Sequence, residues 1–180
     1  PDPTSSGTGY YDVVSWLQMW GDDNGAGGGW KYMDGLHYNI AQYTHSGSKP
    51  CNMAATGEFV MGISFEYRGN TNKDKGAPID LVFPQEGLGW DVESFAIHKG
   101  TNNLEDAKVL ADWAASDEAM KLYGQNYALT SVPGTETKLK YVPDNYEKLL
   151  IDMDFDRASE ERPRILAEWS KRYSNKTEAK

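Results

Sequence analysis

The chain has 180 residues, of which 39% are hydrophobic and 12% aromatic, enough to bury the core of one sizeable domain or two small lobes. Its net charge of −9 disfavours a nucleic-acid partner, because phosphate backbones call for basic patches. No apolar run approaches the roughly 20 residues of a membrane span. The single cysteine, Cys51, excludes an intramolecular disulfide.

The first predicted element is a helix over residues 8–20, in which apolar residues recur at helical spacing from Val13 to Trp20. Small polar residues precede and open it: Ser5, Ser6, Gly7 and Thr8. A helix start leaves backbone N–H groups unpaired and carries a partial positive charge. One hydroxyl is enough for an ordinary N-cap. Several hydroxyls with a glycine favour an anion site instead.

A glycine-rich run over residues 25–29 follows. Its composition, Gly-Ala-Gly-Gly-Gly, is typical of a flexible linker and suggests an engineered or replaced loop. A second helix is expected after it, with Trp30, Met33 and Leu36 on one face.

A unit of strand, hydroxyl-glycine loop and helix is predicted over residues 39–56. Residues 39–44 should form a short strand, and Cys51 should open a helix, with Pro50 in its first turn. The loop between them again holds small hydroxyl residues and a glycine: Ser46, Gly47 and Ser48. Two helix N-termini that face each other can share one anion. An ordinary capped loop is the alternative.

Further strands are expected over residues 59–65, 79–83 and 94–98, the first of them buried by its composition. Glu66 and Tyr67 directly follow the first of these strands. Ligand groups in open α/β sheets lie beyond the carboxyl ends of strands, so both residues are candidates for a site. The alternative is a surface ion pair and a packed ring.

Trp90 and Asp91 lie on a glycine-containing loop before the last of these strands. An exposed tryptophan ring there could stack on a cationic group, worth roughly 0.5–2 kcal/mol. The alternative is that Trp90 closes an edge of the core.

The rest of the chain is predicted to be mainly helical. The expected elements are a helix from Leu104 to Ala114, a helix capped by Ser116, an extended stretch over 127–132, a helix opened by Pro143, a charged helical segment over 154–173, and a frayed tail over 174–180. Pro163 should split the charged segment or begin its last helix.

The sequence holds no signature of a metal or cofactor site. The histidines have no metal-ligand spacing, and there is no cysteine pair, P-loop, nucleophile elbow or dinucleotide fingerprint. We therefore expect a binding protein without a cofactor.

Residues 2–10, Asp-Pro-Thr-Ser-Ser-Gly-Thr-Gly-Tyr, resemble the segment that opens the second lobe of bacterial periplasmic solute-binding proteins of ABC transporters. The branch is the one that binds iron(III), polyamines and phosphonates. Residues 43–51, 62–68 and 86–91 are most similar to its proposed 2-aminoethylphosphonate-binding members. The resemblance covers nearly the whole chain apart from residues 25–29.

This resemblance implies an α/β fold of the type II periplasmic binding protein kind, with the second lobe and the returning part of the first lobe. Residues 1–86 would form the second lobe, 87–123 would return to the first lobe, and 124–180 would pack mainly on the second lobe. The chain would be the C-terminal part of a receptor, with the N-terminal segment of the first lobe outside it.

We accordingly expect a periplasmic receptor that binds a small phosphonate zwitterion, such as 2-aminoethylphosphonate, between two lobes and delivers it to a membrane permease. Its phosphonate would be held by Ser5, Ser6, Gly7, Thr8, Ser46, Gly47 and Ser48. Its ammonium group would be met by Glu66, Tyr67, Trp90 and Asp91. The missing first-lobe segment is a further expected partner.

Two alternatives remain. An iron(III) or polyamine receptor of the same fold would need adjacent tyrosines near residues 66–67, or acids at both ends of the ligand. A phosphate-ester enzyme would need an acid–base pair or a metal beside the hydroxyls.

Overall fold

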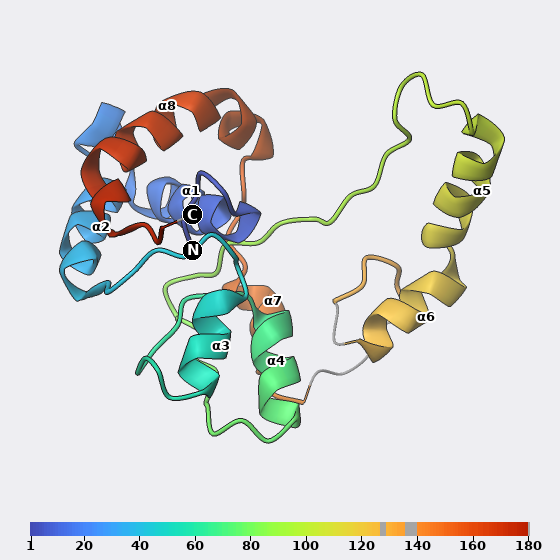
Figure 1. The fold of residues 1–180 in the computed structure, drawn as a ribbon, viewed down its shortest axis with the longest axis horizontal. Helices are drawn as coiled ribbons and strands as arrows, with labels where there is room; N and C mark the ends of the chain where they lie inside the picture. Colours follow the sequence, from blue (N-terminus) through green and yellow to red (C-terminus); the bar gives the residue numbers. More distant parts are fainter. Residues whose placement is uncertain (127–128, 136–139, 180) are drawn as a thin grey trace. The chain divides into compact units, whose positions relative to one another are not determined.

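A computed structural model of the protein describes residues 1–126, 129–135 and 140–179. The chain divides into two compact units, Pro1–Asp91 with Val142–Lys180, and Val92–Tyr141. The first unit holds α1 (Gly7–Trp20), η1 (Asp23–Gly25), α2 (Gly28–Asn39), α3 (Lys49–Ala55), α4 (Glu66–Asp74), α7 (Tyr146–Leu149), α8 (Phe155–Tyr173) and η2 (Ser174–Lys176). The second holds α5 (Leu104–Ala114) and α6 (Asp117–Gln125) (Figure 1).

The core of the first unit lies between α1, α2 and α8. Trp30 of α2 is fully buried, as is nearly all of Trp169 on α8. Both pack with Val13, Val14 and Leu17 of the predicted α1 stripe and with Met33, whereas Trp20 of that stripe is 38% exposed. The Tyr10 hydroxyl donates to the carbonyl oxygen of Ala158, which joins α1 to α8. Helical periodicity therefore located this core correctly.

The glycine run between α1 and α2 is not a flexible linker, so that prediction is wrong. A side-chain carbon at Gly27 would lie 2.3 Å from the Gly21 carbonyl oxygen, and one at Gly29 would lie 2.7 Å from that of Trp16. Residues 28 and 29 already belong to α2. These glycines let the start of α2 pack directly on the backbone of α1.

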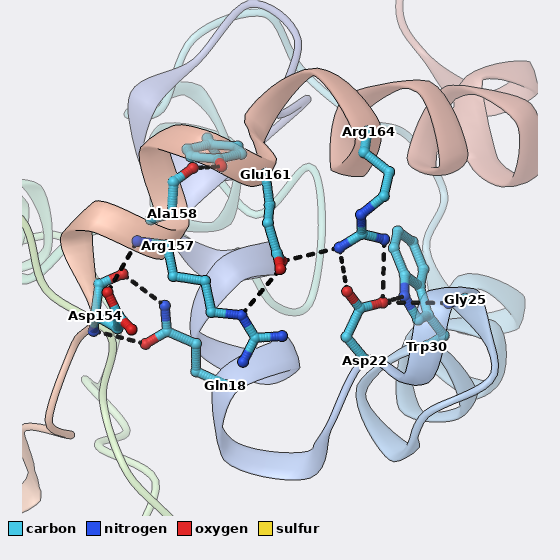
Figure 2. Close-up of polar contacts among 10 residues, drawn as sticks. Gln18, Asp22, Gly25, Trp30, Asp154, Arg157, Ala158, Glu161 and Arg164 are labelled. Carbon is cyan, nitrogen blue, oxygen red and sulfur yellow. Dashed lines mark hydrogen bonds and ion pairs between the residues drawn. The ribbon is translucent and has the colours of Figure 1, made fainter.

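Asp22 lies at the centre of a polar cluster that holds the α1–α2 connection against α8 (Figure 2). Its side chain is 3% exposed and accepts hydrogen bonds from the Trp30 indole and the Arg164 guanidinium. The backbone N–H of Gly25 donates to the same carboxylate at 3.2 Å. Nearby, Gln18 exchanges two hydrogen bonds of 2.9 Å with the backbone of Asp154.

The predicted strands do not form ladders among the described residues. Those residues contain two isolated parallel bridges, Tyr43 with Thr177 and Leu88 with Leu150. The segment over 59–65, expected to be a buried strand, has no regular secondary structure and is largely open to solvent, with Val60 fully exposed and Met61 83% exposed. A strand needs neighbours that pair its backbone and cover its side chains, and the described part of the chain does not supply them.

The C-terminal region also departs from expectation. Pro163 neither splits nor begins a helix, because α8 runs through it. Pro163 is exposed, so water can satisfy the carbonyl that its missing N–H leaves unpaired. The frayed tail is wrong for residues 174–179: the Lys176 ammonium donates to the His37 and Ile40 carbonyl oxygens at 2.6 and 2.7 Å.

The second unit is a pair of helices with an uncovered apolar face. The Ser116 hydroxyl caps α6 by accepting from the Ala119 N–H at 3.2 Å, as predicted. Apolar side chains along α5 are more than a third exposed: Leu104, Val109, Leu110 and Trp113. Residues 127–128, which open the predicted extended stretch, lie outside the described residues. In the part of the chain that is described, no helix combines the length and apolarity needed to cross a membrane.

Candidate functional site

The two hydroxyl-glycine loops, far apart in sequence, meet in the first unit. A side-chain carbon at Gly47 would lie 2.5 Å from the Thr8 hydroxyl oxygen and 3.1 Å from that of Ser6. The loops therefore touch at Gly47, and only a residue without a side chain fits there. The starts of α1 and α3 are brought side by side, which is the arrangement that a shared anion would require.

Some of the hydroxyls at this junction already form hydrogen bonds within the protein. Ser6 is the N-cap of α1 and accepts from the Gly9 N–H at 3.3 Å. The Ser5 hydroxyl lies 3.1 Å from Nδ1 of His45, and the Ser46 and Ser48 hydroxyls lie 3.1 Å from each other. Ser6 therefore forms an ordinary N-cap, as the alternative interpretation of this stretch predicted.

Other donors remain available. Within the described residues, the Thr8 hydroxyl and the backbone N–H groups of Gly7 and Thr8 have no hydrogen-bond partner. Ser46 and Ser5 are exposed. Gly7 and Thr8 lie in the first turn of a 14-residue helix, where the helix dipole favours a negative charge. The junction can therefore donate several hydrogen bonds to an anion.

Sequence reasoning missed two residues at this junction. The Ser64 hydroxyl donates to the Gly47 carbonyl oxygen at 2.6 Å, and so fixes the loop from its other side. Glu178 accepts from the His45 backbone N–H at 2.6 Å and pairs with Lys49. The hydrogen bond from Lys49, followed by that from His45, lowers the pKa of Glu178. Glu178 thereby neutralises the lysine at the start of α3.

Glu66 and Tyr67 are placed at the start of α4, two residues beyond Ser64. Burial raises the pKa of Glu66. The Tyr67 ring stacks on Phe65 with 6.0 Å between centroids, and the Arg68 guanidinium lies 5.7 Å from its centre. One face of Tyr67 is therefore already near a cation supplied by the chain.

Trp90 and Asp91 lie against a different part of the first unit. The Trp90 indole N–H donates to the Ile151 carbonyl oxygen at 2.8 Å, and its ring packs edge-on against Phe155 at 4.9 Å. Asp91 forms a hydrogen bond with Tyr11, whose pKa is raised first by burial and then by this carboxylate. The contacts of Trp90 are those of a residue that closes the edge of the core.

No group of three or more histidine, cysteine, aspartate or glutamate side chains suited to a metal occurs among residues 1–126, 129–135 and 140–179. Cys51 is buried, and burial raises the pKa of its thiol, which disfavours the thiolate needed by a nucleophile. The candidate site offers hydroxyls and amide donors, which are groups suited to binding an anion and not by themselves to cleaving it.

Residues 5–146 match the model of the bacterial extracellular solute-binding protein family. The chain belongs to this family. An uncharacterized protein of Haemophilus influenzae is 32% identical over 174 residues, which are 93% of this chain and 49% of that protein. The family is one of binding proteins and not of enzymes, in agreement with the expectation from the residues.

A solved structure, the periplasmic binding protein AfuA from Actinobacillus pleuropneumoniae with exogenous fructose-6-phosphate bound, is 36% identical, with a TM-score of 0.82. The similarity covers 96% of this chain and 54% of that one. The chain thus has the fold of part of a type II-like periplasmic binding protein, mostly helical with few strands. It spans about half the length of these two relatives.

Proposed function

We propose that the full-length protein is the periplasmic receptor of an ABC importer and that it binds a small molecule with a phosphoryl group. The meeting of the two hydroxyl-glycine loops at Thr8 and Gly47 carries this proposal. Membership of the solute-binding family supports the receptor role. Closure of two lobes around the ligand would then signal its presence to the membrane permease.

The junction suits a phosphonate or phosphate monoester because its donors are neutral. Lys49 is engaged by Glu178, so hydroxyl and N–H groups must supply most hydrogen bonds to the anion. A hydrogen bond to a charged acceptor contributes roughly 1.5–3 kcal/mol, and several together can hold a doubly charged group. The remaining ligand contacts would come from the part of the receptor outside this chain.

Two ligand classes have specific support. A zwitterion such as 2-aminoethylphosphonate is favoured by Glu66, an acid close in sequence to Ser64 and therefore to the junction. Trp90 and Asp91 support it less, because of their packing against Phe155 and Tyr11. A sugar phosphate is favoured by the fructose-6-phosphate bound to AfuA. Both classes share the phosphoryl group and differ in the group attached to it.

The first prediction tests the phosphoryl site. In the full-length receptor, Thr8→Val should weaken binding of the true ligand about ten- to a hundredfold, since one charged-acceptor hydrogen bond is lost. Isothermal calorimetry should compare 2-aminoethylphosphonate with ethylphosphonate, and fructose 6-phosphate with fructose. The ligand is the compound that binds more tightly than its paired analogue and loses affinity in the Thr8 variant.

Thr56→Val is the matched control, because Thr56 ends α3 and its hydroxyl donates to carbonyl oxygens within that helix. It should leave affinity unchanged. Wild-type-like binding by the Thr8 variant would show that the hydroxyls are helix caps only. Binding of none of the four compounds would reject a phosphoryl ligand of either class.

A further inference from the structure

The connection between α1 and α2 contains the dipeptide Asn24-Gly25, and Asn24 is the only asparagine of the chain that a glycine follows. Asparagine is a thermolabile residue, because the backbone nitrogen of the next residue can attack its side-chain amide. A following glycine has no side chain to obstruct that attack. Asn24 is also exposed. Sequence and exposure alone therefore predict rapid deamidation at this position.

The chemistry of deamidation sets two requirements on the folded chain. The Gly25 backbone nitrogen attacks Cγ of Asn24, and its proton leaves with the amide NH₂ as ammonia, which closes a succinimide ring. Water then opens the ring to aspartate or to isoaspartate, whose backbone runs through Cβ. The Gly25 nitrogen must therefore be able to lose its proton. It must also lie on the same side of the Cα–C bond of Asn24 as Cβ.

The backbone conformation of Asn24 does not meet the second requirement. Its φ is 51° and its ψ is 44°, in the left-handed region that asparagine enters more readily than most residues. Since Cβ is offset from the backbone nitrogen by about 120° around the Cα–C bond, this ψ places the Gly25 nitrogen nearly opposite Cβ. Asp23 and Gly25 also have positive φ, of 43° and 95°. The ring cannot close unless this turn rearranges.

Hydrogen bonds hold the turn in this conformation (Figure 2). The Gly25 N–H donates to the Asp22 carbonyl oxygen at 3.0 Å and to the Asp22 carboxylate at 3.2 Å. The adjacent negative charge opposes loss of the proton from that nitrogen. The Arg172 guanidinium donates to the Gly25 carbonyl oxygen at 2.6 Å, and Asp34 and Glu168 hold Arg172 in turn. Asp22 and α8 thus restrain the nitrogen that would attack.

We propose that Asn24 is a deamidation site that the fold keeps unreactive, and that it reacts only when the α1–α2 connection opens away from α8. The reaction then makes that opening irreversible. Isoaspartate adds one carbon to the backbone and a negative charge next to Asp22 and Asp23. The connection has no room for a longer backbone, because a side-chain carbon at Gly27 would already lie 2.3 Å from the Gly21 carbonyl oxygen. This inference is independent of the ligand.

The test compares the folded 180-residue chain with the same chain unfolded in urea, both kept at pH 8. Peptide mapping by mass spectrometry follows loss of the Asn24 amide, and enzymatic isoaspartyl methylation identifies isoaspartate. Asn24 should react about tenfold or more slowly in the folded chain, because only the open fraction reacts. A smaller difference between the two states would overturn the proposal.

Arg172→Gln tests the restraint from α8. It removes the donor to the Gly25 carbonyl oxygen, so the folded variant should deamidate at Asn24 faster than its globally unfolded fraction, measured by urea denaturation, accounts for. Lys171→Gln is the matched control, since it removes a positive charge from the exposed neighbouring residue of α8. An Arg172 variant that reacts no faster than the Lys171 variant would overturn the proposal.

Irreversibility has its own measurement, which needs no variant of α8. The isoaspartate form, separated from the unreacted chain, should have a lower thermal midpoint than Asn24→Asp, which adds the charge without lengthening the backbone. Equal midpoints for these two chains would overturn the claim that the reaction prevents reclosure.

Discussion

At the scale of single residues, Asp22 shows how one buried carboxylate joins segments far apart in sequence (Figure 2). Burial alone would raise the pKa of its carboxyl, but hydrogen bonds from Arg164 and Trp30 outweigh it and hold the pKa below 3.8. The charged form is therefore stabilised by folding. This contribution is present above the ordinary pKa and is lost as the pH falls through the lower pKa of the folded state.

The second prediction concerns this carboxylate. Asp22→Asn should lower the free energy of unfolding by about 2–3 kcal/mol at pH 7, since it leaves the partly buried Arg164 without its main counter-ion. Urea denaturation at pH 7 and at pH 3 measures the effect, which should shrink at the lower pH because pH 3 lies below the ordinary pKa, so the carboxyl of the unfolded chain is then mostly protonated. Asp80→Asn, at an exposed pair with Lys73, should leave the midpoint unchanged at both values. An undiminished loss at pH 3 would contradict the assignment to charge.

The candidate site was only partly predictable from residues. Thr8 and Gly47 could be found because hydroxyls and glycine at two helix starts form a local pattern. Glu178 could not, because it lies in a polar stretch that looked like a frayed end and reaches His45 only through tertiary contacts. Nor did the glycine-rich loop around Trp90 reveal that Phe155 would cover its ring.

At the scale of elements, the helices were predictable and the sheet was not. Periodicity and caps locate α1, α6 and α8 because their hydrogen bonds lie within the element. A strand is completed by other segments, so residues 59–65 have the composition of a buried strand but lie exposed here. The same dependence on neighbours explains the glycines of α2, whose role became visible only once α1 packed against them.

The third prediction compares two glycines of α2. Gly29→Ala should destabilise the chain by about 1–3 kcal/mol, because its methyl group would overlap the backbone of Trp16 and Leu17. Gly35→Ala lies in the same helix with nothing within 4 Å, and should stabilise the chain by about 0.5–1 kcal/mol through helix propensity. Urea denaturation of both variants decides it. Equal effects would show that the run over 25–29 is a linker after all.

At the scale of the whole molecule, residues 92–141 form an insertion into the first unit. Backbone hydrogen bonds join the two segments of the first unit that flank the insertion. The Leu88 N–H donates to the Leu149 carbonyl oxygen at 2.7 Å, and the Ile151 N–H donates to the Leu88 carbonyl oxygen at 3.0 Å. The core cluster of the first unit contains no residue of the insertion. The first unit therefore has its own basis for folding.

The fourth prediction follows from this closure. Replacing residues 92–141 with about ten Gly and Ser residues should leave cooperative thermal unfolding intact. The shorter connection should itself favour folding by about 1 kcal/mol through loop-closure entropy. Near-UV circular dichroism of the buried tryptophans measures the transition. Loss of a cooperative transition would mean that the insertion contributes to the core of the first unit.

The bridge between Tyr43 and Thr177 also affects when, during folding, the proposed anion site can form. The loop at His45 is held by Glu178, so a nascent chain has both hydroxyl clusters long before it has the residue that fixes one of them. Contacts over such sequence separations form late, because the loop they close costs entropy first. Under the proposed function, the helices of the chain therefore form before the contact that completes its anion site.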